Sequence, residues 1–163
     1  MINEELFTLA ENTVAKLKEN NLTVATAESC TGGMVASFIT SVSGVSEVFE
    51  LGIASYSCRI KNEVLGVKNE TLTELGAVSE QTAAEMAENV RKIANSDLGV
   101  SVTGAAGPNG TEGHPPGYVF IAVSGKNGTF TRLLNVEPKS RNFVRESAVS
   151  AVFELIIDYI GEL

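Results

Sequence analysis

The chain has 163 residues, about the length of one ordinary domain, and its hydrophobic fraction of 44% suffices for a buried core without a metal or disulfide crosslink. Its net charge of −8, without a dense Lys/Arg cluster, makes nucleic acid a poor partner, because nucleic-acid binders need basic surface. Two cysteines and one histidine are too few for a secreted disulfide framework or a Cys/His zinc site.

The first part of the chain predicts helices alternating with strands. Apolar residues at helical spacing predict a helix over residues 3–20, and a short β-type run follows at 22–27. A polar, glycine-containing turn then leads into a helix at 34–42. Next come a strand at 48–56 and a short helix at 60–65 that ends at Gly66.

The second part predicts one long helix, three strands and a closing helix. Ser79 caps a helix to Asn95 whose inward side is Ala83, Met86, Ala87, Val90, Ile93 and Ala94. A strand at 98–103 precedes a loop at 104–116 that holds three of the four prolines. Strands at 118–124 and 129–136 flank Asn127-Gly128, a hairpin signal. The helix at 138–160 has an inward side of Phe143, Val144, Ala148, Val152, Leu155, Ile156 and Ile160.

This order of elements predicts an α/β fold. Strands separated by helices favour a layered α/β/α sandwich, and the hairpin makes the sheet mixed because its two strands must be antiparallel. We see no repeat and no linker, so residues 1–163 are predicted to form a single domain.

The segment Ala27-Glu28-Ser29-Cys30-Thr31-Gly32-Gly33 lies where a predicted strand meets a predicted helix. The first N–H groups of a helix are unpaired and carry partial positive charge, and glycines let a ligand approach the backbone. A hydroxyl here lies beside a potential oxyanion or phosphate site. Taken alone, the segment is explained more simply by Ser29 or Thr31 capping the helix.

A second segment, Tyr56-Ser57-Cys58-Arg59-Ile60-Lys61, follows the next strand. It could bring a tyrosine hydroxyl and a lysine to the sheet edge. A lysine can act as a general base only when its pKa falls, through burial or through a nearby cation such as Arg59. Taken alone, an exposed lysine is the simpler interpretation.

Two further features could bind an anion. The loop that begins Thr103-Gly104-Ala105-Ala106-Gly107 follows a strand, where open α/β sheets bind ligands, although it matches neither a P-loop nor a dinucleotide fingerprint. Arg141 and Arg145 share one face of the last helix and suit a phosphate, or else form a solvated face with Glu146.

The single histidine, His114, lies in the proline-rich loop beside Pro115 and Pro116, a poor place to hold a general base. If Ser29 is a nucleophile, a lysine base, as in Ser-Lys enzymes, is therefore the better hypothesis than a Ser-His-Asp triad.

Together these segments resemble the CinA C-terminal domain family, whose stand-alone members include nicotinamide-nucleotide amidase. The resemblance covers residues 7–160, and AESCTGG at 27–33 is its most specific part. Further matching pieces, in the same order, are Tyr56-Ser57 with Lys61, Leu65-Gly66-Val67, Gly76-Ala77-Val78-Ser79, the loop from Thr103 to Pro108 with Gly117, and Arg141 with Arg145.

The resemblance implies hydrolysis of the carboxamide of nicotinamide mononucleotide to nicotinic acid mononucleotide and ammonia, without a metal or cofactor. It implies Ser29 as nucleophile, Lys61 as its base and Tyr56 as a hydroxyl that orients or relays the proton. Amides at the helix start would form the oxyanion hole. The substrate-binding residues it implies are Cys30, Thr31, Gly32, Thr103, Gly104, Gly107 and Arg141. The loop from Thr103 to Gly107 and Arg141 would hold the ribose phosphate.

Two departures keep alternatives open. Cys58 stands where the family often has Asn, and the segment Glu112-Gly113-His114-Pro115-Pro116 lacks a lysine that the family usually shows. One alternative makes Cys30 the nucleophile, since a helix N-terminus lowers a cysteine pKa. Another is a non-catalytic module that binds a nucleotide for regulation.

The expected partner is a small nucleotide substrate. Glu4 and Glu5 stand where a signal peptide would carry positive charge, and no apolar run approaches the roughly 20 residues of a membrane span. We therefore expect a cytoplasmic protein without a membrane partner, one that forms a homo-oligomer, either a dimer or a trimer.

Overall fold

A mixed five-stranded sheet with strand order β2-β1-β3-β4-β5 organises the computed structural model, which describes residues 3–163. The strands are β1 (Val24–Glu28), β2 (Phe49–Ala54), β3 (Leu98–Gly104), β4 (Tyr118–Gly125) and β5 (Gly128–Asn135). β1 pairs in parallel with β2 and β3, whereas β4 is antiparallel to both β3 and β5. The predicted mixed α/β sheet is confirmed.

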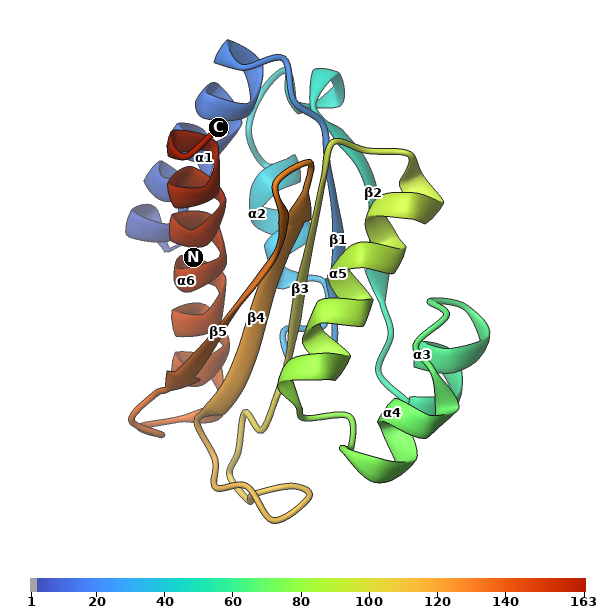
Figure 1. Ribbon diagram of the computed structural model, residues 1–163. Coiled ribbons are helices and arrows are strands. Elements are labelled where there is room, and N and C mark those ends of the chain that lie inside the picture. The colour runs from blue at the N-terminus through green and yellow to red at the C-terminus, as the bar shows by residue number, and fades with distance from the viewer. Residues whose placement is uncertain (1–2) are drawn as a thin grey trace.

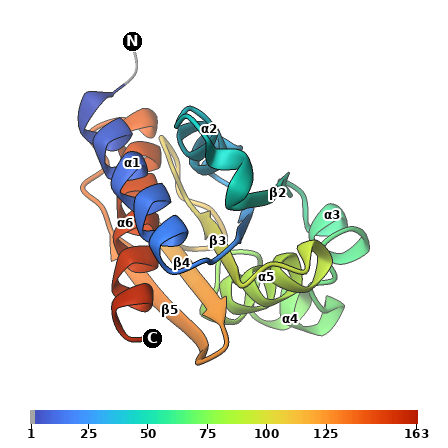
Figure 2. The same cartoon turned by 90° about the horizontal axis from the view of Figure 1, so that it is seen from above.

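Helices cover both faces of the sheet (Figures 1 and 2). α1 (Glu4–Glu19), α2 (Met34–Thr40) and α6 (Arg141–Gly161) pack together on one face and enclose the larger apolar core. α5 (Glu80–Ala94) packs on the other face, and α3 (Cys58–Glu63) and α4 (Asn69–Glu74) lie beside it. No helix of the described residues is long and apolar enough to cross a membrane.

Short polar residues set where the helices begin. The side chains of Asn3, Ser57, Ser79 and Ser140 each accept a hydrogen bond from a backbone N–H in the first turn of the helix that follows. Because Ser140 is the cap, the last helix begins at Arg141 rather than at the predicted residue 138.

The structure differs from the predicted elements at a few points. α4 and a 3₁₀ turn (Val45–Glu47) were not predicted, because both are too short to show an apolar period. Ile93 and Phe143 were predicted to face inward, but they are 51% and 37% exposed. Each lies near the end of its helix, where the packed layer no longer covers it. The hairpin turn is Lys126-Asn127, since Gly125 pairs with Gly128.

The parallel strands determine where chemistry can gather. β1, β2 and β3 all end at the same edge of the sheet, so the segments that follow them meet there (Figure 1). Ser29 follows β1, Tyr56 comes shortly after β2, and the loop at 105–117 follows β3.

Candidate active site

A cavity of about 430 Å³ opens at the carboxyl ends of these strands. The end of β3, the segments that follow β1, β2 and β3, α3, the segment before α5 and the start of α6 form its wall. They are Ser29, Cys30, Tyr56, Ser57, Cys58, Lys61, Ala77, Val78, Thr103, Gly104, Ala105, Ala106, Gly107, Asn109, Thr111, Glu112 and Arg141. Most of the predicted site residues therefore line one cavity, whereas Thr31 and Gly32 are not part of its lining.

The Ser29 hydroxyl and the Lys61 amine meet inside this cavity. Lys61 Nζ donates a hydrogen bond to Ser29 Oγ at 2.9 Å, and both side chains are buried. The Ser29 backbone N–H donates to the Val102 carbonyl at 2.9 Å, which fixes the serine against the neighbouring strand β3. Residues 32 positions apart in the sequence are thus in direct contact, in the arrangement that a serine nucleophile and a lysine base would need.

Burial favours the neutral form of Lys61. The side chain is 1% exposed and forms no ion pair within residues 3–163, and burial lowers its pKa below the usual 10.5. Burial is the largest influence on this pKa, and nearby acidic groups such as Glu112 oppose the shift only partly. Arg59, the alternative cause considered from sequence, is exposed and paired with Glu63 instead.

A carbonyl orients the lysine. Lys61 Nζ also donates to the Ser55 carbonyl at 2.6 Å. A neutral amine has two N–H groups and one lone pair. Because a carbonyl can only accept, one N–H is committed to Ser55. When the amine is neutral, the Ser29 hydroxyl can turn and donate to its lone pair across the same 2.9 Å contact.

Glu28 stabilises the turn that follows Ser29 through its side chain, and it was not predicted to be part of the site. Its buried carboxylate accepts from the N–H groups of Gly33, Val35 and Ala36 at 2.9–3.1 Å. The charge therefore caps the start of α2 from the preceding strand. A carboxylate next to the serine, just before a glycine-rich helix start, is the signal that could have revealed it.

This cap corrects the predicted oxyanion hole. The amides that open α2 are occupied by Glu28, and the Gly32 N–H donates to the Ser29 carbonyl at 3.0 Å. The N–H groups of Cys30 and Thr31 donate to no backbone carbonyl within residues 3–163, so these two remain candidates.

Arg145 supports the same turn from α6. Its guanidinium donates to the carbonyls of Cys30 and Thr31 at 3.2 and 2.8 Å. Both acceptors are backbone atoms next to the nucleophile, and Arg145 does not line the cavity. The structure thus separates the two arginines, because Arg145 braces the turn while Arg141 lines the cavity.

Tyr56 and Arg141 meet at the cavity wall. Arg141 donates to the Tyr56 hydroxyl at 2.7 Å and to the Gly107 carbonyl at 2.6 Å. Tyr56 is 61% exposed, and within the described chain no hydrogen bond joins it to Ser29 or Lys61. In this conformation the Tyr56 hydroxyl accepts a hydrogen bond from Arg141 and forms none with Ser29.

Thr103 and Gly104 shape the cavity wall through packing. The buried Thr103 hydroxyl donates to the Ala77 carbonyl at 2.6 Å and so holds the segment before α5. A Cβ on Gly104 would lie 2.7 Å from the Tyr118 carbonyl oxygen, too close for any larger residue. A glycine is therefore required here by the neighbouring strand.

The chain matches the CinA C-terminal domain family model over residues 6–160. It belongs to the CinA C-terminal domain family. One relative is a protein of Acetivibrio thermocellus named as a competence-damage inducible protein. It is 49% identical over 148 residues, which are 90% of this chain and 36% of the relative. A CinA-like protein of Kosmotoga olearia is 45% identical over 149 residues, 91% of this chain and 36% of the relative. The chain thus spans about a third of the length of these curated relatives.

Solved structures of CinA proteins share the fold. The competence/damage inducible protein of Agrobacterium tumefaciens superposes with a TM-score of 0.90 at 35% identity, covering 94% of both chains. A CinA superfamily protein of Klebsiella pneumoniae superposes with a TM-score of 0.94 at 27% identity, covering 97% of this chain and 99% of the other.

In this CinA domain Cys30 is poorly suited to act as a nucleophile. Burial raises the pKa of its thiol to about 11, although a hydrogen bond from its own backbone amide and the positive charges of Arg141 and Arg145 oppose the shift. Cys30 is 5% exposed. A buried thiol with a raised pKa supplies little thiolate near neutral pH, so the geometry favours Ser29 over Cys30.

His114 lies outside the serine cavity of this CinA domain. Its ring stacks on Tyr118 with a centroid separation of 4.3 Å, and it lines a neighbouring hollow instead. No group of three or more His, Cys, Asp or Glu side chains within residues 3–163 could hold a metal ion.

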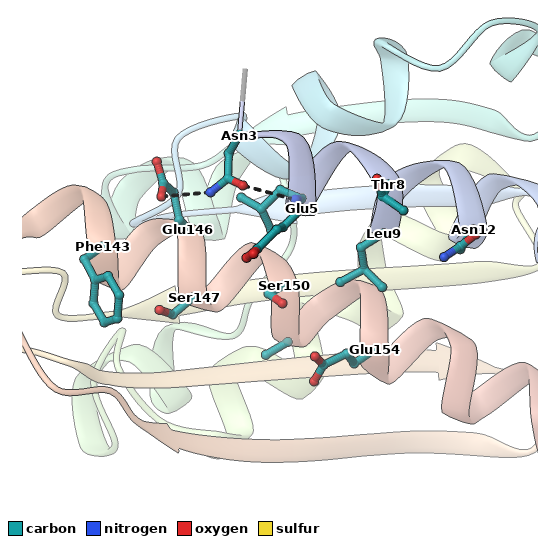
Figure 3. A pocket seen from close by; sticks show the side chains of 12 residues that line it. Asn3, Glu5, Thr8, Leu9, Asn12, Phe143, Glu146, Ser147, Ser150 and Glu154 are labelled. Carbon is teal, nitrogen blue, oxygen red and sulfur yellow. Dashed lines mark hydrogen bonds between the residues drawn. The ribbon is translucent and has the colours of Figure 1, made fainter. Parts of the chain in front are cut away.

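A larger hollow, of about 690 Å³, lies between α1 and α6 (Figure 3). Glu5, Glu146 and Glu154 line it together with serines of α6, and Asn3 donates to Glu146 at 3.3 Å. Among residues 3–163, no cysteine lines this hollow, nor does any lysine or histidine that could activate a nucleophile. The smaller cavity at the strand ends is therefore the candidate active site.

Proposed function

We propose that this CinA domain is an amidohydrolase that converts nicotinamide mononucleotide to nicotinic acid mononucleotide and ammonia. The observation that carries the proposal is the buried contact of 2.9 Å between Lys61 Nζ and Ser29 Oγ. The carboxamide as reacting group and the mononucleotide as substrate come from the family resemblance, and the cavity chemistry supports them.

In the first half of the reaction, Ser29 Oγ attacks the carboxamide carbon while neutral Lys61 takes the hydroxyl proton. A tetrahedral oxyanion forms, and the N–H groups of Cys30 and Thr31 are its proposed donors. Lys61 then returns the proton to the amide nitrogen, the C–N bond breaks, and ammonia leaves an ester on Ser29.

In the second half, Lys61 is neutral again and takes a proton from water. The water oxygen attacks the ester carbon, and the proton returns to Ser29 Oγ as the acid is released. One base thus serves both steps, and its bond to the Ser55 carbonyl keeps the amine in place between them.

Arg141 is the proposed phosphate ligand. Its guanidinium lines the cavity, and two of its donors are occupied by Gly107 and Tyr56. A guanidinium carries five N–H donors, so further donors remain for a phosphate. Tyr56 then orients Arg141, and a direct part in proton relay stays a prediction. The expected homo-oligomer and the cytoplasmic location also stay predictions.

An ammonia-release assay tests the proposal with three related amides: nicotinamide mononucleotide, nicotinamide riboside and nicotinamide. The expected result is release from the mononucleotide well above the other two, because only it carries the phosphate. Equal release from all three would contradict the Arg141 phosphate site. Tight calorimetric binding of the mononucleotide without ammonia release would favour the non-catalytic nucleotide-binding module instead.

A further inference from the structure

The cavity carries opposite fixed charges on two sides. Arg141, at the start of α6, supplies the positive charge. Glu112 supplies the negative charge, and its carboxylate is bonded to the segment that precedes α5. α6 and α5 lie on opposite faces of the sheet (Figures 1 and 2), and β1, the strand that leads to Ser29, belongs to the sheet between them.

Glu112 is held firmly in this position. Its two carboxylate oxygens accept from the N–H groups of Ala77 and Val78 at 2.9 and 2.8 Å. A Cβ on Gly76 would lie 2.5 Å from Glu112 Oε2, and Gly76 has a φ of +85°, so only glycine leaves room for the carboxylate. Each oxygen accepts one bond and keeps a second lone pair for a ligand.

Glu112 is also the one carboxylate among the described residues that line the cavity. The burial of Lys61, which is 1% exposed, disfavours a positive charge on its amine. The fixed charges that line the cavity are therefore one cation at the start of α6 and one anion bonded to the segment before α5. A ligand of uniform negative charge would be attracted at one side and repelled at the other.

We propose that Glu112 is a specificity-determining residue that selects a cationic ring, so that the site takes a zwitterionic amide with its anionic group at Arg141. This inference rests on the proposed function and adds that the site selects its ligand by the charge of the ring. The ring of nicotinamide mononucleotide is a pyridinium cation and its phosphate is an anion. The dihydro form has the same ribose, phosphate and carboxamide but a neutral ring.

The test compares the binding of these two nucleotides to the Ser29→Ala variant, which removes turnover. Calorimetry gives the ratio of the Kd of the dihydro form to the Kd of the oxidised form. We expect a ratio of about 5, the upper range for a partly exposed charge pair. Adding Glu112→Gln should bring the ratio to about 1. A merely structural loss would weaken both nucleotides together and leave the ratio unchanged.

Two matched variants complete the test. Glu112→Asp keeps the charge and should preserve the preference for the cationic ring even where overall affinity falls. Glu154→Gln removes an exposed carboxylate from the distant α1–α6 hollow and should leave the ratio unchanged. If both nucleotides bind and the ratio of their Kd values is the same before and after Glu112→Gln, the inference about Glu112 is wrong, and the proposed function is unaffected. Binding of neither would contradict the proposed function, and the inference with it.

Discussion

At the scale of single residues, the chemistry depends on a lysine that the fold keeps out of water. Lys61 is a buried side chain without an ion-pair partner in the described chain, and its amine contacts a serine hydroxyl and a backbone carbonyl. Burying a charge without a partner is costly, so the neutral amine is the favoured form. A neutral amine is what a general base requires.

Replacing Lys61 with methionine keeps most of the buried volume and removes the base. We expect kcat for ammonia release to fall by about 10²–10⁴-fold, the usual contribution of a general base. Steady-state assays at saturating nucleotide measure this. A variant that keeps wild-type turnover would show that another group takes the proton.

The same variant reports the lowered pKa through stability. Between the lowered pKa of folded Lys61 and its usual value near 10.5, the unfolded chain binds a proton that the folded chain does not. The wild-type free energy of unfolding should therefore rise with pH, relative to Lys61→Met, and level off near pH 10.5. Urea unfolding at several pH values from 7 to 10 measures the difference. A constant or falling difference would mean that Lys61 is charged in the folded state.

The two cysteines provide a test of which nucleophile the site uses. Cys30 is buried with a pKa raised to about 11, whereas Cys58 is exposed. Brief treatment of the native protein with iodoacetamide near pH 7.5 should alkylate Cys58 and spare Cys30. Peptide mass mapping reads both sites in one sample, so Cys58 is the internal control. Rapid alkylation of Cys30 would return it to consideration as the nucleophile.

At the scale of elements, the start of α2 shows how a strand prepares the site. Glu28 is the last residue of β1, and its carboxylate binds three amides of the helix start. The turn between them carries Ser29 and the two amides proposed as oxyanion donors. The position of Ser29 therefore depends on a buried carboxylate that has no role in the proposed reaction.

Replacing Glu28 with glutamine should disturb this turn. The amide has one oxygen acceptor, and its NH₂ group would face a backbone N–H, so the expected cost is about 1–3 kcal/mol of unfolding free energy. kcat should fall as well, because Ser29 is no longer held in line. Glu50→Gln, an exposed carboxylate on β2, is the matched control and should leave both unchanged. Wild-type stability in the Glu28 variant would show that the cap contributes little.

Sequence reasoning predicted the elements better than their contacts. Helical spacing and caps located the long helices, since each has an apolar face and a polar N-cap. The packing of Gly104 against Tyr118 and the cap from Glu28 could not be predicted, because both depend on which strands become neighbours. The hydrogen bond from Lys61 to the Ser55 carbonyl was not predicted either, because a backbone acceptor has no signature in the sequence.

At the scale of the whole molecule, the sheet brings together residues that are far apart in the chain. Ser29, Lys61 and Arg141 come from the first, middle and last parts of the sequence, yet all line one cavity at the carboxyl ends of the parallel strands. Their assignment to one site came from the family resemblance, because their spacing alone does not predict contact. The mixed sheet order explains why the contact arises.

The central claim is that the Ser29 hydroxyl attacks the amide. Its most direct test is the rate of ammonia release from nicotinamide mononucleotide by Ser29→Ala, beside the wild type and the exposed control Ser41→Ala. Equal thermal melting of the three proteins would show that the fold is intact. The account predicts that Ser29→Ala loses at least about 10³-fold in kcat and that Ser41→Ala matches the wild type. Turnover by a folded Ser29→Ala protein at the wild-type rate would contradict it.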